Sequence, residues 1–162
     1  MNTLSGRDIF LIATSFLLAL LLSILPLPTW LKFIWPAWLP LILIYWVIAL
    51  PHRISLGIAW LLGLLLDSLY GTLLGEHALA LAVITYIADH FHRQMRMFPI
   101  LQQAVSIFFL VLAYQTLLVW MQGMLGLFEN FYLFWLSALT SMLLWPWLYM
   151  FFRGLRQRFH VY

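Results

Sequence analysis

The 162-residue chain has no cysteine and very few charged residues. Without cysteine it can form neither a disulfide framework nor a thiol-based catalytic site. Charged side chains make up 8% of the sequence, whereas a soluble domain carries roughly a quarter. The net charge of +3 is small and scattered along the chain, so it gives no indication of nucleic-acid binding. These deficits exclude an ordinary water-soluble domain.

The sequence is instead rich in hydrophobic residues, which account for 65% of it. They form long apolar runs without a charged residue, for example residues 9–25, 39–50 and 54–66. Helices that are apolar on every side face lipid or other buried helices, whereas membrane β-strands would alternate apolar with polar residues. The first run lacks a small-residue cleavage site and is interpreted as a retained span, not a signal peptide. We therefore predict an all-α, polytopic membrane helix bundle that forms a single domain over residues 1–162.

The breaks between the runs indicate six transmembrane helices. We expect them at about Ile9–Leu25, Trp38–Leu50, Ile54–Leu74, Ala78–His90, Ile100–Gln122 and Phe131–Phe152. The fourth is short, so the distribution of Lys and Arg decides whether it crosses the membrane. With six spans and a cytoplasmic N-terminus, every arginine lies inside and only Lys32 lies outside. Six spans, cytoplasmic termini and a fourth helix that continues past Asp89 are therefore predicted.

The third predicted span carries a stripe of small residues with one aspartate. Ala59, Gly63, Asp67, Gly71 and Gly75 follow one another at steps of four, which places them on one helix face. Small residues at this spacing let two helix backbones approach closely. The stripe is therefore expected to pack either against another helix of this chain or against the membrane helix of a partner.

Asp67 is the acidic residue that lies deepest in a predicted span. A carboxylate near the bilayer centre costs about 2.5–3.5 kcal/mol on insertion scales, so it needs a partner or a proton. Counted along the helices, Gln115 lies at a similar depth and is the candidate hydrogen-bond partner, and Lys32 could reach in from outside. Three roles stay open for Asp67: a structural anchor, a contact with a partner protein, or proton or substrate chemistry.

The segment between the first two spans is unusual in composition. Residues 26–40 hold four prolines together with Trp30, Lys32, Trp35 and Trp38. Tryptophan favours the headgroup layer of a membrane, so this segment is expected to lie along the outer face. It would serve there as an interfacial anchor or as a docking surface.

The last span and the tail carry a proline and a basic cluster. Pro146 is expected to bend the sixth helix near Met142, and Arg153, Arg156 and Arg158 form a predicted cytoplasmic anchor for anionic lipid. His90 and His92 are two residues apart and so lie on different sides of a helix, while the other histidines lie at different membrane levels, so no metal site is expected. We find no nucleophile–base pair and no cofactor motif, and the prediction is a protein that is not an enzyme.

Three passages carry a resemblance to a known family: WLPLILIYWVIALPHRISLG, GLLLDSLYGTLLGEHALA and LLWPWLYMFFRGLRQRF. With them the chain resembles the MreD family of rod shape-determining proteins, from about Trp38 to Phe159. The middle passage, with Asp67, Gly71 and Gly75, is similar to the family's signature. None of the three is a catalytic motif.

The resemblance implies a place in the bacterial inner membrane and in the machinery of cell elongation. Such proteins bind MreC, a single-span protein with a periplasmic domain, and belong with MreB filaments and the RodA–PBP2 peptidoglycan synthase. The implied function is a non-enzymatic scaffold without cofactors, required for rod shape and lateral peptidoglycan synthesis. The family is similar at fold level to the S components of energy-coupling-factor transporters, which implies the alternative of a small-molecule or lipid binding and transport protein.

Overall fold

The computed structural model describes residues 5–51, 53–127, 132 and 134–159. Within these residues the regular elements are helices, as predicted. The helices are α1 (Gly6–Ile24), α2 (Thr29–Ile34), α3 (Trp38–Ala49), α4 (Leu56–Tyr70), α5 (Glu76–Met97), α6 (Ile100–Met124) and α7 (Phe134–Phe159).

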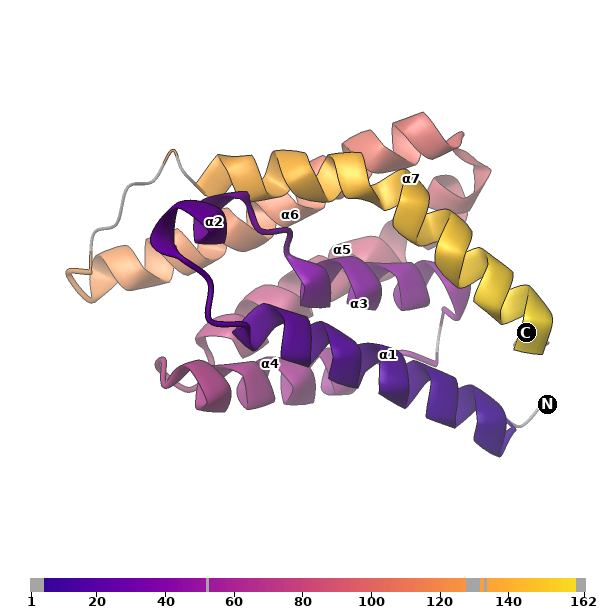
Figure 1. Ribbon diagram of the computed structural model, residues 1–162, viewed down its shortest axis with the longest axis horizontal. Coiled ribbons are helices and arrows are strands. Elements are labelled where there is room, and N and C mark those ends of the chain that lie inside the picture. The colour runs from indigo at the N-terminus through magenta and orange to yellow at the C-terminus, as the bar shows by residue number, and fades with distance from the viewer. Residues whose placement is uncertain (1–4, 52, 128–131, 133, 160–162) are drawn as a thin grey trace.

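The six longer helices run side by side and alternate in direction, while the short α2 lies across one end of the bundle (Figure 1). The first described turn of α1 and the last turn of α7 lie together at the opposite end. We name these two ends the α2 end and the termini end. An even number of passes is the arrangement that the six-span prediction requires.

The helices differ in length and composition, and the 22-residue α5 is long enough to cross a membrane but is not as apolar as the others. The helices α1, α6 and α7 are long and apolar enough to cross a membrane, whereas α3 and α4 are shorter apolar helices. The helix α3 is buried along almost its whole length, from Leu39 to Ala49, and contacts α1, α5, α6 and α7. A helix enclosed by its neighbours meets little lipid, so its shortness does not conflict with a membrane fold.

The predicted boundaries hold well for α6, whereas α7 continues to Phe159, past the predicted end at Phe152. The fourth predicted span does continue past Asp89, because α5 ends at Met97. The last helix is continuous through Pro146, and its axis turns part-way along (Figure 1). The missing amide and the ring of a proline inside a helix account for such a bend.

The predicted end of the third span is wrong. The helix α4 ends at Tyr70 and not at Leu74, because Gly71 adopts a left-handed conformation with φ of 67°. A second glycine, Gly75, has φ of 105° and immediately precedes α5. Glycine reaches such angles without steric cost, so the two residues form the tight turn that joins α4 to α5.

Candidate functional site

The α4–α5 turn is built around Asp67, whose side chain is fully buried. Its Oδ1 accepts hydrogen bonds from the Thr72 hydroxyl at 3.1 Å, from the His77 amide at 2.9 Å and from His77 Nδ1 at 2.7 Å. Its Oδ2 accepts one from the Gly75 amide at 2.9 Å. The first amides of a helix have no partner inside the helix and carry a partial positive charge. Asp67, on α4, therefore accepts the hydrogen bonds of the Gly75 and His77 amides at the start of α5.

The predicted hydrogen bond between Asp67 and Gln115 is wrong. Gln115 donates to the Ser137 hydroxyl at 3.4 Å, and the carboxylate of Asp67 is surrounded by donors from the turn next to it. Equal depth along two helices does not fix which faces meet, and the glycine turn brings closer donors to the carboxylate.

Gly63 lies where α4 and α5 come closest. A Cβ atom added to it would be 2.2 Å from the Cα of Ala78 and 2.5 Å from its amide nitrogen. The predicted close approach of two backbones is therefore found at Gly63, and the helix that it meets belongs to this chain. It is not found at Gly71 or Gly75, where an added Cβ would have no neighbour within 4 Å. The predicted helical stripe is wrong beyond Asp67, because the helix has ended.

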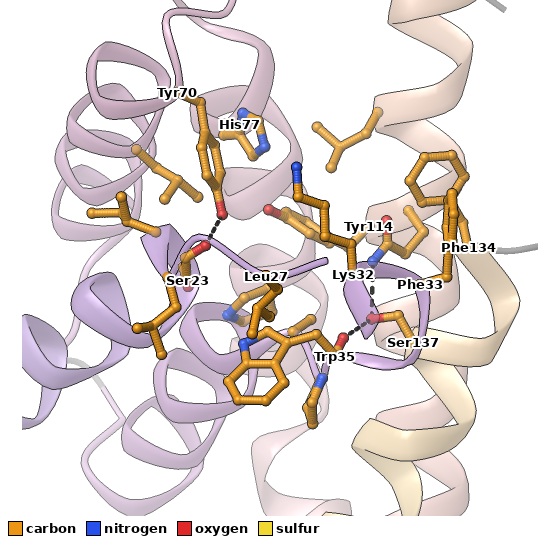
Figure 2. Close-up of a pocket in the computed structure, with 18 of the residues that line it drawn as sticks. Ser23, Leu27, Lys32, Phe33, Trp35, Tyr70, His77, Tyr114, Phe134 and Ser137 are labelled. Atoms are coloured by element: carbon orange, nitrogen blue, oxygen red, sulfur yellow. Dashed lines mark hydrogen bonds between the residues drawn. The ribbon is translucent and has the colours of Figure 1, made fainter. Parts of the chain in front are cut away.

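Next to this turn, at the α2 end, the helices surround a partly open pocket of about 510 Å³. Figure 2 shows the side chains of Tyr70, His77, Tyr114 and Lys32 converging on it from four elements. Gln115 and Gln122 also line it, and Gln122 donates to the Glu76 carboxylate at 2.6 Å. Polar side chains from several helices thus meet in this pocket, together with apolar side chains of α1, α4 and α6.

The chemistry available in this pocket is binding and orientation. Asp67 accepts from Nδ1 of His77, which fixes the ring and leaves only Nε2 for a ligand. Ser23 and Ser137 line the pocket, but their hydroxyls donate to the carbonyls of Ala19 and Trp35, both at 2.8 Å. In this part of the chain we see no nucleophile–base pair. Among all described residues, no group of three His, Cys, Asp or Glu side chains could hold a metal ion.

Comparison with known proteins identifies the family. The model of the rod shape-determining protein MreD matches residues 8–155. The chain is 33% identical to the rod shape-determining protein MreD of Haemophilus influenzae over 152 residues, which cover 92% of each chain. The chain belongs to the MreD family. Membership supports a role in determining rod shape within the rod-shape machinery. No solved structure matches the chain, so the expected similarity to S components stays a prediction.

The family passage around Asp67 is one structural unit. Gly63 admits the backbone of α5, Asp67 binds the start of that helix, and Gly71 and Gly75 shape the turn between them. His77 completes the unit and was missed by the sequence analysis, which treated it as part of a loop. The sequence does indicate this partner. His77 follows Asp67 by ten residues with two glycines between them, a spacing that suits a tight turn between antiparallel helices.

The predicted outer segment is held firmly on the bundle. The Trp35 indole donates to the Leu22 carbonyl of α1 at 3.0 Å, and Ser137 and Ser141 of α7 bind the backbone at Trp35 and Ala37. Trp35 and Trp38 are half-buried and meet edge to face, with ring centroids 6.0 Å apart. Among the three tryptophans of this segment only Trp30 is well exposed, at 66%.

The three arginines of the predicted basic anchor do not lie together in the structure. Arg153 and Arg156 line a second cavity, at the termini end, whereas Arg158 is exposed on the last turn of α7 and does not line it. Arg96, which the sequence analysis counted among the cytoplasmic arginines, reaches the end of α3 and donates to the carbonyls of Ile48 and Ala49, both at 2.7 Å.

Proposed function

We propose that this MreD-family chain is a non-enzymatic inner-membrane scaffold of the cell-elongation machinery. It supports rod shape and lateral peptidoglycan synthesis through binding MreC, and it works with MreB, RodA and PBP2 directly or through MreC. The observation that carries the proposal is the family match over residues 8–155.

The proposed orientation places the termini end in the cytoplasm and the α2 end at the periplasmic face. The arginines at residues 53, 96, 153 and 156 surround a cavity at the termini end, and basic residues concentrate on the cytoplasmic side of membrane proteins. Lys32 lies on α2 at the other end.

The surface proposed for MreC is the segment around α2, residues 25–37, which makes up most of the predicted outer segment. We call it the α2 segment. The α5 backbone already occupies the Gly63 face of α4, so the alternative in which a partner's membrane helix packs on that face is set aside. A partner with a periplasmic domain would meet the α2 end first. There Trp30 is 66% exposed on a segment that side-chain hydrogen bonds hold in place. Exposed tryptophans on ordered backbone are frequent anchors of protein interfaces.

Co-purification of MreC with Trp30→Ala tests this surface. We expect the variant to reach normal membrane levels and to retain less than about a tenth of the MreC, which corresponds to roughly 1.4 kcal/mol. The matched control is Trp147→Ala, which removes a tryptophan that is 72% exposed on α7. Equal retention of MreC by both variants would show that MreC does not bind at Trp30 of α2.

One observation favours the second candidate function, binding of a small molecule or lipid. The pocket at the α2 end has a volume within the range of ligand sites and brings Lys32, His77 and Tyr114 together above apolar walls. Mass spectrometry of the protein purified in mild detergent separates the two candidates. A stoichiometric vitamin-like ligand that is lost in His77→Ala would support binding and transport, whereas stoichiometric MreC without such a ligand supports the scaffold.

A further inference from the structure

The termini end contains a cavity of about 720 Å³ that is enriched in arginine. Its walls come from the end of α3, the α3–α4 turn, the end of α5 and the last turns of α7. Arg53, Arg96, Arg153 and Arg156 all line it, together with Tyr45, Tyr149 and Gln157. None of the carboxylates in the described ranges lines it.

The acidic residues of the described chain are engaged elsewhere. Asp67 and Glu76 lie at the α2 end, where they accept the hydrogen bonds of the α4–α5 turn and of Gln122. Asp8 accepts from the Ser5 amide at the start of α1, and a carboxylate oxygen of Asp89 lies 3.8 Å from His92 Nδ1. Among the described carboxylates, none therefore lines this cavity as a counter-charge to its arginines.

One of these arginines, Arg96, is held in position by hydrogen bonds. Arg96 uses Nε and Nη2 to bind the last carbonyls of α3, where the helix dipole is negative. Arg153 and Arg156 are three residues apart on α7 and so lie on neighbouring positions of one face. Below them Tyr45 packs against Tyr149 and Phe152, with ring centroids 5.9 Å and 5.1 Å away. A low-dielectric floor under charges of one sign strengthens their attraction for an anion.

We propose that this cavity binds the headgroup of an anionic phospholipid that carries two phosphates. Guanidinium groups bind phosphate oxygens through paired hydrogen bonds. Arg153 and Arg156 can each bind one phosphate in this way, and Arg53 and Arg96 add positive charge to the same cavity. The volume falls within the range of ligand sites. Basic pockets between membrane helices on the cytoplasmic side favour such headgroups. The assignment of this lipid to the cytoplasmic leaflet rests on the orientation given under the proposed function. The binding of the lipid does not depend on MreC.

The site differs from the diffuse basic anchor predicted from the tail alone. Arg53 and Arg96 are distant from the tail in sequence, yet they share the cavity with Arg153 and Arg156. Arg158 belongs to the same basic tail but not to the cavity. This difference gives a control that removes the same charge from the same helix.

The proposal is tested by native mass spectrometry of the full chain in detergent, which measures the affinity for cardiolipin in a titration. The pocket variant carries Arg153→Gln and Arg156→Gln, and the control carries Arg158→Gln. We expect the pocket variant to bind cardiolipin about tenfold or more weakly, which corresponds to roughly 1.4 kcal/mol, and the control to change less than about twofold, as for a surface charge. Phosphatidylglycerol should bind more weakly than cardiolipin, and phosphatidylcholine should not compete.

Several outcomes would overturn the proposal. Equal weakening by Arg158→Gln and by the pocket variant would indicate general surface attraction. Competition by inorganic phosphate as strong as that by cardiolipin would assign the cavity to a free anion. Normal lipid binding with loss of a co-purified acidic protein in the pocket variant would assign it to a protein segment. If the double variant melts early, Arg156→Gln alone is compared with Arg158→Gln. Lipid binding is measured without MreC, so it can fail or succeed independently of the proposed function.

Discussion

At the scale of single residues, Asp67 shows how a buried carboxylate is accommodated in a membrane bundle. The side chain is fully buried and accepts four hydrogen bonds, three of them from Gly75 and His77. A burial cost of several kcal/mol for an isolated charge is offset when donors surround both oxygens. This arrangement favours the structural role among the three that the sequence left open.

Replacing Asp67 tests this role. In Asp67→Asn the amide group can accept through one oxygen only, so either the Gly75 amide or the donors at Oδ1 lose their acceptor. We expect a loss of about 1–3 kcal/mol for an unsatisfied buried donor and a larger loss for Asp67→Leu, seen as lower melting temperatures in detergent. Asp89→Asn is the control, because its side chain is 45% exposed. Wild-type stability of Asp67→Asn with failed complementation of cell shape would instead indicate proton chemistry.

Gly63 allows a second residue-scale prediction. In Gly63→Ala the new Cβ would meet the Ala78 backbone at 2.2 Å, so α4 and α5 must separate. We expect a destabilisation of about 3 kcal/mol, at the upper end of ordinary overpacking, measured as thermal unfolding in detergent. Gly57→Ala, on the same helix, meets only the Ser55 hydroxyl at 3.5 Å and should be neutral or slightly stabilising. Similar melting temperatures for both variants would refute the close approach.

At the scale of helices, the turn between α4 and α5 depends on backbone conformation and not on packing. Gly71 has φ of 67° and open space around it. A side chain in the left-handed region costs about 1–2 kcal/mol, and asparagine tolerates it better than most residues. We therefore expect Gly71→Ala to lower the melting temperature and Gly71→Asn to lower it less. If Ala and Asn are equally harmful, the positive φ is not what requires glycine here.

The six longer helices and two residues of the site, Gly63 and Asp67, could be predicted from the sequence, whereas the short helix α2 and the partners of Asp67 could not. Long apolar runs and the arginine distribution are enough for six helices with ends near Ile24, Ala49 and Met124. The end of α4 was missed because Leu73 and Leu74 extend the apolar run past Gly71, and hydropathy does not report φ. The partner of Asp67 was missed because helix depth does not determine helix rotation. Burial of α3 on all sides likewise depends on packing that no single segment encodes.

At the scale of the whole molecule, the two ends of the bundle differ in chemistry. Asp67, His77 and the α2 segment lie at the α2 end, whereas four arginines line one cavity at the termini end. A reporter that is active only in the periplasm, fused after Tyr162, should give no signal in the proposed orientation. The same reporter inserted after Gly126, in the α6–α7 connection at the α2 end, should be active. The reverse pattern would invert the bundle and move the arginine cavity to the periplasmic face.

The central claim, that this MreD-family chain works as a scaffold through MreC, is tested most directly by purifying it from elongating cells in mild detergent. The account predicts that MreC accompanies the chain in a fixed stoichiometric ratio, and that Trp30→Ala loses MreC while the chain stays folded. Recovery of the folded wild-type chain without MreC, from cells whose rod shape depends on the chain, would contradict it.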